Sequence, residues 1–169
     1  MEKLKAHLSF ELDGELYAIN AGKVMSILEM VRLTRIPNSP PYLAGVINLR
    51  GKVLPVINTR VKLGLPDCER NSQTAIIVIN VVVSKETVTL GIMVDNVHSV
   101  LEIEDTHLMP PPSIGKSYKA EYITAIIEGS VQENEKEILD KKLIMLLDID
   151  KIFEDINMEI ITNQELASK

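Results

Sequence analysis

The sequence predicts a mostly β protein made of two copies of one β unit. Its apolar stretches are short, rich in Val and Ile, and bounded by Gly, Pro, Asn or Asp, as is typical of strands. One half of the chain repeats the apolar pattern of the other half. With 46% hydrophobic residues among 169, the chain can bury a sizeable core. We therefore expect packed sheets that are punctuated by short helices.

Turn-forming residues divide the chain into a series of predicted strands. Proline cannot donate a sheet hydrogen bond, so the proline-rich segments 37–41 and 109–117 are predicted to be loops. Between such breaks the strands are expected near residues 7–12, 15–20, 31–36, 43–49, 53–57, 75–83, 86–94, 99–104, 122–128 and 142–148.

Two segments space their apolar residues at helical intervals. One is "DIDKIFEDI", near the end of the chain. The other is Lys23–Met30, in which the spacing involves Val24, Ile27 and Leu28. Residues 157–168 are expected to add an amphipathic C-terminal helix.

A constant offset of 73 residues aligns "YAINAGKVMSILEMVRLTRIP" with "LGIMVDNVHSVLEIEDTHLMP". After an insertion the alignment resumes with Tyr42 on Tyr122, and later with Val53 on Leu143. Three segments in the same order are hard to explain by a shared preference for Val and Leu. The chain therefore looks like an internal duplication.

The duplication sets the expected domain organisation. We place one domain at 7–155, with its first copy at about 15–72, its second copy at about 75–155, and an N-terminal strand that can pair across; 156–169 form a helix or tail. A unit of about 70 residues has a marginal core alone, so the two units should interlock and share an apolar seam. The groove between them is a suitable binding site.

The composition disfavours nucleic acid and membranes as partners. A formal net charge of -6 repels phosphate backbones and anionic lipids, and 4% aromatic residues leave few surfaces on which bases could stack. The chain has no uncharged apolar run of about 18 residues and no signal-peptide core at its N-terminus. The single cysteine, Cys68, cannot form an intramolecular disulfide, and a reactive thiol is the alternative. We expect a cytoplasmic protein without direct membrane insertion.

Catalytic and metal-binding motifs are weak. "GVINLRGKV" resembles a phosphate-binding loop, but its glycine spacing is one residue too long, and Val53 stands where Ser or Thr would bind magnesium. In "HSVLEIEDTH", strand alternation would divide the His and acidic residues between two faces. Glu29 and Glu102 are equivalent in the repeat, and nothing indicates that they converge as an acid and base. We predict a protein that is not an enzyme, with no catalytic residues, no metal and no cofactor.

The segment "NLRGK" contains a short turn that only the first copy has. Gly51 can adopt positive φ and so satisfies a tight hairpin, but turn formation does not require Arg50. The second copy has the longer, glutamate-rich "EGSVQENEKEILDKK" at this place, which we expect to be a solvated loop. Arg50 is therefore either a functional side chain or a plain charged residue at the tip.

In "IPNSPPYLAGVINLRG", "VLPVINTR" and "LGIMVDNVHSVLEI" the chain resembles the CheW family of chemotaxis coupling proteins, from about Phe10 to Phe153. The resemblance implies two SH3-like five-stranded β-barrel subdomains and no enzymatic activity. It implies an adaptor that couples the regulatory domain of the CheA histidine kinase to the cytoplasmic tips of methyl-accepting chemotaxis receptors and helps to assemble the signalling array. Two alternatives stay open: a nucleotide-dependent enzyme that uses Arg50-Gly51-Lys52 as an anion loop, and a barrel module that binds an unrelated cytosolic protein.

The resemblance also implies a receptor-binding groove. Arg50 would hydrogen-bond polar side chains of a receptor helix hairpin. Two glycines of the groove either allow a partner backbone to approach or only relieve crowding between strands. Family members often carry an acidic residue at the position of Ser26, and Glu29 is a candidate to pair with Arg50 instead. The expected groove residues are Val24, Ile27, Gly45, Arg50, Gly51 and Gly91.

Contacts with the kinase or with the rest of the array are expected at the loop ends of the barrels. The candidates lie around "MPPPSI", where apolar residues occur among prolines, and core packing is the competing explanation. These residues are Leu108, Met109 and Ile114.

Overall fold

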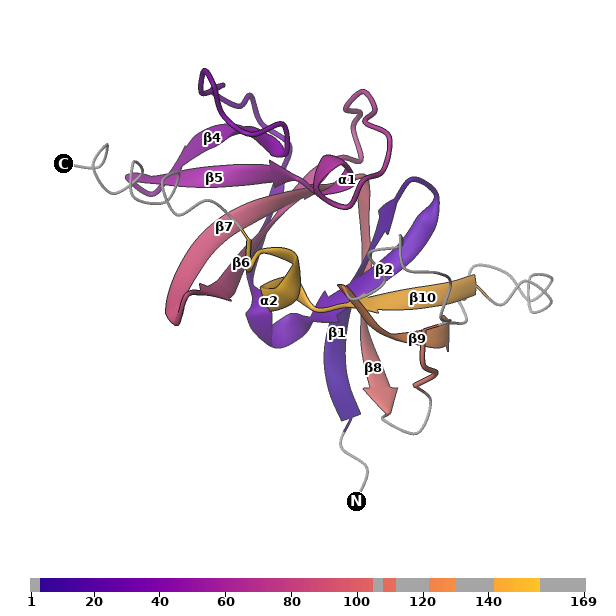
Figure 1. The fold of residues 1–169 in the computed structure, drawn as a ribbon. Helices are drawn as coiled ribbons and strands as arrows, with labels where there is room; N and C mark the ends of the chain where they lie inside the picture. Colours follow the sequence, from indigo (N-terminus) through magenta and orange to yellow (C-terminus); the bar gives the residue numbers. More distant parts are fainter. Residues whose placement is uncertain (1–3, 105–107, 112–121, 130–141, 156–169) are drawn as a thin grey trace.

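Two five-stranded sheets make up most of the computed structural model, which describes residues 4–104, 108–111, 122–129 and 142–155 (Figure 1). Sheet A contains β1 (Leu4–Leu12), β2 (Glu15–Asn20), β8 (Asn96–Glu104), β9 (Ile123–Gly129) and β10 (Lys142–Leu147). Sheet B contains β3 (Val24–Glu29), β4 (Leu43–Leu49), β5 (Lys52–Asn58), β6 (Ala75–Val83) and β7 (Glu86–Val94). The predicted mostly β class is confirmed.

The helices of the described chain are short. They are the 3-10 helix η1 (Ala21–Lys23) and the α-helices α1 (Thr59–Lys62) and α2 (Ile149–Ile152). Helix α2 confirms the helix predicted in "DIDKIFEDI", whereas α1 was not predicted. The predicted helix at 157–168 lies outside the described residues.

Helices α1 and α2 occupy equivalent places in the repeat. The side chains of Asn58 and Asp148 cap their N-termini by accepting hydrogen bonds from backbone amides of the first turn. The backbone amides of the same two residues donate to the carbonyl oxygens of Tyr42 (2.7 Å) and Tyr122 (3.0 Å) respectively. Each copy thus ends its last strand with the same capped turn, which a β-rich pattern alone does not reveal.

The two copies exchange their first hairpins. Hairpin β1–β2 comes from the first half of the chain but lies in sheet A with β8, β9 and β10, whereas β6–β7 from the second half lies in sheet B with β3, β4 and β5. The orders β8-β1-β2-β10-β9 and β3-β6-β7-β5-β4 become identical when each strand is replaced by its repeat partner. Each sheet is therefore complete only with a hairpin from the other half.

Strand registers repeat in the same way. β10 runs parallel to β2 with Leu146 opposite Ala18, and β5 runs parallel to β7 with Val56 opposite Gly91. These two pairs are equivalent under the sequence alignment. The internal duplication is thus present in the pairing of the strands as well as in the sequence.

A shared core joins the two sheets. It contains fully buried side chains from both sheets, among them Phe10 of sheet A and Ile79 of sheet B. Burial of one such side chain contributes about 1.5–3 kcal/mol. The opposite faces of the sheets bury two smaller clusters, one around Ala18 and one around Val56. The apolar seam expected from the duplication is confirmed.

Each sheet is closed toward a barrel by the segment that follows its edge strand β3 or β8. Thr34 forms an isolated antiparallel bridge with Val46 of β4, and Met109 forms one with Ile126 of β9. The two edges of each sheet are thereby joined. Below, barrel A means sheet A with the segment to Met109, and barrel B means sheet B with the segment to Thr34.

Two predictions for this region were wrong. The segment predicted as a helix, Lys23–Met30, contains strand β3, in which half-buried and exposed residues alternate. Because apolar residues lie on both faces of this edge strand, their spacing also fits a helical period. The strand predicted at 31–36 is instead an irregular segment with a single bridge at Thr34, followed by Pro37, which cannot donate a sheet hydrogen bond.

Candidate functional site

The turn between β4 and β5 places Arg50 at an exposed tip. Arg50 has φ of 52° and Gly51 has φ of 82°, and the Gly51 amide donates to Oδ1 of Asn48 at 2.9 Å. Positive φ at both central residues is the pattern of a type I′ hairpin, which favours Asn, Asp or Gly at the first position. Arginine is therefore an unfavourable choice for this turn, and the geometry of the turn does not explain its presence.

Val24 and Ile27 lie on β3, at the edge of sheet B. Val24 is half-buried and packs against the shared core, whereas Ile27 is 48% exposed. Arg50 follows β4, which is the other edge strand of the same sheet. The structure therefore separates the two parts of the predicted groove by three strands, and the segment that closes barrel B links them. Among the described residues no ion pair joins Glu29 to Arg50.

Gly45 and Gly91 lie where a side chain would collide with neighbouring residues of the same chain. A Cβ at Gly45 would lie 2.7 Å from the carbonyl oxygen of Thr34, and the residue has φ of 155°, which L-residues avoid. A Cβ at Gly91 would lie 2.8 Å from Cγ2 of Ile76, inside barrel B. Both glycines thus make room for neighbouring residues within the fold. Of the two explanations given above, this geometry fits the relief of crowding between strands.

Replacing Gly91 with Ala is expected to reduce the free energy of unfolding by about 1 kcal/mol, because the new methyl group must displace the Ile76 side chain. The cost is modest because Ala18, at the equivalent position of barrel A, already fits there. Urea unfolding measures this change. A variant as stable as the parent chain would show that barrel B has unused space at this position.

The predicted apolar loop is partly described. Leu108 is 36% and Met109 39% exposed. The backbone of Met109 exchanges two hydrogen bonds of 2.8 Å with Ile126, so its position is fixed while its side chain stays accessible. Ile114 lies outside the described residues.

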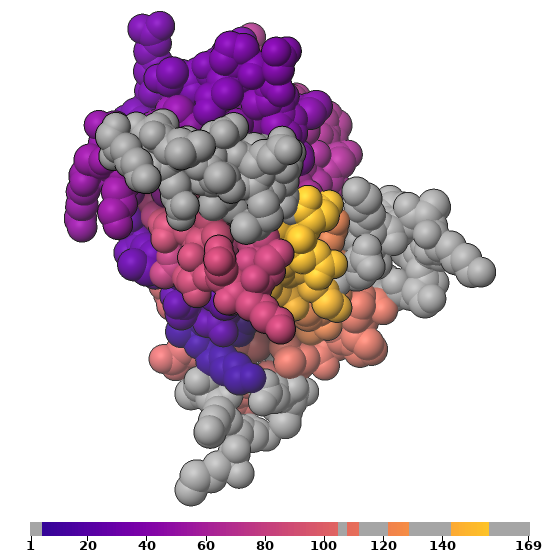
Figure 2. Space-filling view, turned by 60° about the vertical axis from the view of Figure 1, so that its left-hand side comes forward, coloured from indigo at the N-terminus to yellow at the C-terminus, as the bar shows by residue number. Residues whose placement is uncertain are grey.

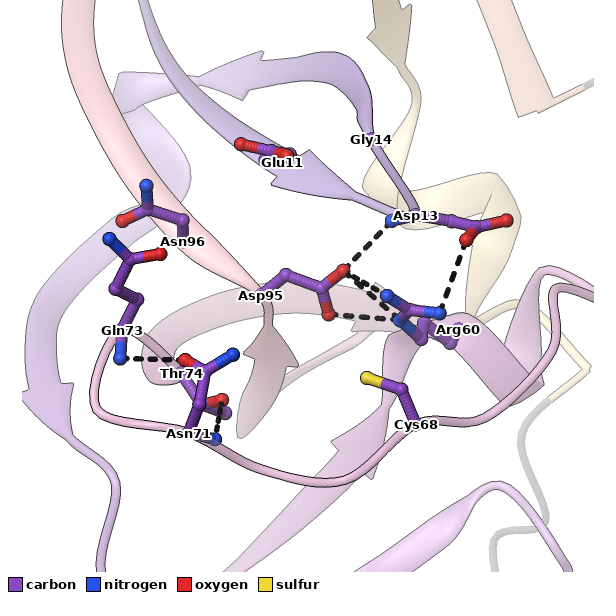
Figure 3. A pocket seen from close by; sticks show the side chains of 10 residues that line it. All are labelled: Glu11, Asp13, Gly14, Arg60, Cys68, Asn71, Gln73, Thr74, Asp95 and Asn96. Carbon is purple, nitrogen blue, oxygen red and sulfur yellow. Dashed lines mark hydrogen bonds and ion pairs between the residues drawn. The ribbon is translucent and has the colours of Figure 1, made fainter.

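A charged cluster around Arg60 joins three segments that are distant in the sequence (Figure 3). Arg60 donates from Nε to Oδ1 of Asp95 at 2.9 Å and from one terminal nitrogen to Oδ1 of Asp13 at 3.4 Å. The amide of Asp13 donates to Oδ2 of Asp95 at 2.8 Å. The hydrogen bond with Asp95 raises the pKa of Arg60 above its usual value. The cluster fastens the tip of hairpin β1–β2 to α1 and to the link between β7 and β8.

The equivalent place in the other copy has an ion pair of inverted sign. Asp150 of α2 accepts from Lys23 at 3.1 Å and from the amide of Val82 at 2.9 Å. Asp150 aligns with Arg60 in the repeat, and Val82 lies near the end of β6, close to the turn of hairpin β6–β7, whereas Asp13 lies in the turn of β1–β2. Figure 2 shows the yellow surface of α2 against the pink surface of this hairpin. Both exchanged hairpins are thus held at their tips by a carboxylate.

A pocket lined mainly by polar side chains lies beside Arg60. It has a volume of about 230 Å³, and its wall includes Glu11 and Cys68. Burial raises the pKa of the Cys68 thiol, so the thiol is not activated as a nucleophile, although the residue as a whole is exposed. His98 contacts Glu11 at 3.1 Å, and no group of three His, Cys, Asp or Glu side chains in the described ranges is arranged to bind a metal ion. No helix in those ranges is long and apolar enough to span a membrane.

Comparison with known proteins adds to this geometry. The family model described as a CheW-like domain matches residues 6–157, which include both barrels. The chain belongs to the CheW family. It is 31% identical to Chemotaxis protein CheW of Klebsiella aerogenes over 92% of this chain and 86% of that protein. It is 32% identical to the Thermotoga maritima protein of the same name over 90% of this chain and 89% of that one.

A solved structure of a CheW protein has the same fold. The crystal structure of scaffolding protein TtCheW from Thermoanaerobacter tengcongensis matches with a TM-score of 0.72 and 27% identity, covering 91% of this chain and 95% of that one. The two interlocked five-stranded sheets are therefore the CheW arrangement.

For a CheW-family chain, the Arg60 cluster is the feature that sequence reasoning missed. Arg60 is 35 residues from Asp95 and 47 from Asp13, so no local pattern links them. One signal was available: Arg60 and Asp95 are single charges directly after long apolar strands, "VLPVINT" and "LGIMV". A charged side chain at the end of a buried strand needs an opposite charge or a hydrogen-bonding group nearby. Which residue provides it depends on which strand ends lie next to each other in the fold, and the sequence does not show this.

Proposed function

We propose that this chain is a non-enzymatic chemotaxis adaptor that couples the CheA histidine kinase to the cytoplasmic tips of chemoreceptors and assists array assembly in the cytoplasm. The observation that carries the proposal is the CheW-like match over residues 6–157. The relatives are named chemotaxis proteins, and the solved relative is described as a scaffolding protein. A scaffold needs surfaces that present side chains to partners, and both barrels have exposed apolar residues on fixed backbone.

The proposed receptor-binding surface lies on barrel B. Arg50 and Gly51 form the tip of the β4–β5 hairpin, and Ile27 with Val24 lies on the opposite edge strand beside the shared core. A guanidinium at an exposed tip can form directional hydrogen bonds with polar side chains of a helix hairpin. Exposed Ile27 would supply apolar area. Gly45 and Gly91 support this surface from within by allowing close packing inside barrel B.

The proposed kinase or array contact lies on barrel A. Leu108 and Met109 are exposed apolar residues beside the edge strand β9, and Ile114, five residues after Met109 in the sequence, is proposed with them. The backbone of Met109 is held by its bridge to Ile126, so binding through this side chain does not also have to order the main chain. The adaptor would thus use one barrel for each class of partner.

Direct binding tests the proposed function. The chain is titrated with a chemoreceptor signalling fragment and, separately, with a CheA regulatory-domain fragment, and binding is followed by calorimetry. We expect saturable binding to both fragments at about tens of micromolar or below. The absence of binding to both fragments, with the chain shown to be folded, would contradict the proposal.

Met109→Asp is expected to weaken binding to the CheA fragment about three- to tenfold, because it places a charge in an apolar contact. Receptor binding should be unchanged. Leu143→Asp is the matched control, since Leu143 is a 49% exposed apolar residue on β10 of the same barrel. Calorimetry with both fragments checks the result. Equal losses for the two variants would show that barrel A does not use Met109 specifically.

A further inference from the structure

Met25 of β3 presents its thioether to solvent. Its side chain is 61% exposed. The register of β3 against β6 shifts between Val24 and Ser26, so Met25 lies in a bulge, where a residue is left out of the regular ladder. Water and small solutes therefore reach the sulfur directly.

The sulfur is nevertheless bound on one side by the neighbouring strand. Nδ2 of Asn80, on β6, donates a hydrogen bond to Sδ of Met25 at 3.0 Å. The hydroxyl of Thr89, on β7, donates to Oδ1 of Asn80 at 2.7 Å, so the amino group of the amide is the end that faces the sulfur. Side chains from three adjacent strands thus hold the thioether in one orientation.

The other methionines of the described chain are in different surroundings. Met93 is buried, and Met30 and Met145 are half-buried. Met109 is 39% exposed, but within the described ranges no side chain donates a hydrogen bond to its sulfur. Exposure combined with a fixed polar neighbour is thus particular to Met25 among these residues.

Oxidation of a thioether by hydrogen peroxide depends on which side of the sulfur is accessible. A lone pair of the sulfur attacks one peroxide oxygen, and the S–O bond forms as the O–O bond breaks. The proton of the transferred oxygen passes to the departing hydroxide, which leaves as water. The sulfur is oxidised by two electrons and the peroxide is reduced. Because the sulfur of methionine sulfoxide is chiral, the lone pair that reacts decides which epimer forms.

We propose that Met25 is a reversible oxidation site at which Asn80 selects one sulfoxide epimer. The Asn80 nitrogen is already in contact with the sulfur at 3.0 Å, and a peroxide oxygen does not fit between the two atoms. The lone pair on the other side of the sulfur faces water and reacts. A single methionine sulfoxide reductase then restores the thioether, because each of these reductases acts on one epimer.

Oxidation changes the edge of barrel B without entering the core. Met25 lies outside the buried clusters, and the equivalent residue of barrel A is the exposed, polar His98. The sulfoxide is polar, whereas Ile27 on the same strand stays apolar. Because β3 belongs to the proposed receptor-binding surface, we expect oxidation to weaken receptor binding about threefold. This consequence rests on the proposed function.

Epimer analysis of the folded chain tests the oxidation site. The chain is treated with hydrogen peroxide, and tandem mass spectrometry distinguishes Met25 from Met30 in the tryptic peptide 24–32. Reductases specific for each epimer, added to the peptides, then measure the epimer ratio. We expect one epimer to exceed the other at least about threefold at Met25, and a ratio near one at Met109 and for chain oxidised in concentrated urea.

Asn80→Val is the matched variant, because valine favours strands and has no side-chain donor. It should bring the epimer ratio at Met25 close to one. Thr89→Val keeps the donor but frees the Asn80 amide to rotate, so it should give an intermediate ratio. A ratio near one in the folded parent chain, or an unchanged ratio in Asn80→Val, would overturn the proposal.

Receptor binding is measured separately. The chain and its Met25→Leu variant, which keeps a similar volume and cannot be oxidised at this position, are each titrated with the receptor fragment before and after peroxide treatment. A threefold loss in the parent chain alone supports the expected consequence, and equal losses in both would assign the effect to another residue and contradict it. If the untreated chain does not bind the fragment, the proposed function fails, while the epimer ratio still decides the oxidation site.

Discussion

Replacing Arg60 with Ala is expected to lower the free energy of unfolding by about 2–4 kcal/mol. The Arg60 side chain is 13% exposed, and its main partner Asp95 is 22% exposed. Removing the guanidinium leaves the Asp95 carboxylate partly buried without its cation, and also removes the bond to the carbonyl oxygen of Pro66. It also removes the bond from Arg60 to Asp13 in the turn of hairpin β1–β2, whereas the Asp13 amide still donates to Asp95. Urea unfolding at neutral pH measures the loss.

Lys23→Ala is the comparison for this prediction, because Lys23 pairs with Asp150, the residue of α2 that also accepts a hydrogen bond from Val82 in the other exchanged hairpin. The side chains of this pair are 35% and 38% exposed, so water screens the pair and the expected loss is only about 0–1 kcal/mol. Asp150 also keeps its bond to the amide of Val82 in this variant. If the two variants lose a similar free energy of unfolding, burial does not make the Arg60 cluster more stabilising than the Lys23–Asp150 pair, and the prediction is wrong.

Arg50→Ala is expected to weaken binding to the receptor fragment by about 2 kcal/mol, roughly thirtyfold, and to leave the melting temperature nearly unchanged. The side chain lies at an exposed tip and has no ion-pair partner in the described ranges, so its loss removes no internal contact of that kind. Arg50→Gly should weaken binding equally and raise stability by up to about 1 kcal/mol, because glycine accepts positive φ without strain. Calorimetry and thermal unfolding check both effects.

Arg70→Ala serves as the control for Arg50, since it removes an exposed arginine from the 66–73 loop. It should change neither receptor binding nor stability. If Arg50→Ala unfolds the protein, Arg50 is structural, and the functional explanation for its strained position is lost.

Much of the fold could be predicted from the sequence, because the chain contains two copies of one unit. Each predicted strand could therefore be checked against the equivalent segment of the other copy. The alignment of Val53 with Leu143 anticipated equivalent strands, and the structure pairs these two residues with Asn48 and Glu128, which are equivalent under the offset of 80. The alignment of Val24 with Val97 was not used in this way, because the segment of Val24 was predicted to be helical. The exchange of hairpins could not be read in this way. A hairpin has the same sequence pattern whether it completes its own sheet or that of the other copy.

Strand β3 shows why local patterns failed elsewhere. Ile27 is exposed on this edge strand and Val24 and Leu28 are half-buried, and the spacing of these three apolar residues made the segment look helical. Exposed apolar residues on an edge strand also invite pairing with another chain, so they are expected mainly where a partner covers them. The misassigned segment coincides with the proposed receptor surface, as expected where function rather than folding selects the residues.

The candidate site was predictable to a lesser degree. Arg50 was identified because a tight turn does not require it, and its positive φ strengthens that argument. Gly45 and Gly91 could not be assigned from sequence, because partner approach and internal crowding select the same residue. Only the distances to Thr34 and Ile76 distinguish these explanations.

The most direct test of the central claim is an amide NMR titration of the chain with a chemoreceptor signalling fragment. If barrel B captures receptor helices, the amides of Ile27 and of Arg50 to Lys52 should shift together and saturate, while those around Met109 stay in place. Shifts confined to barrel A, or none at about 100 μM fragment, would contradict the claim.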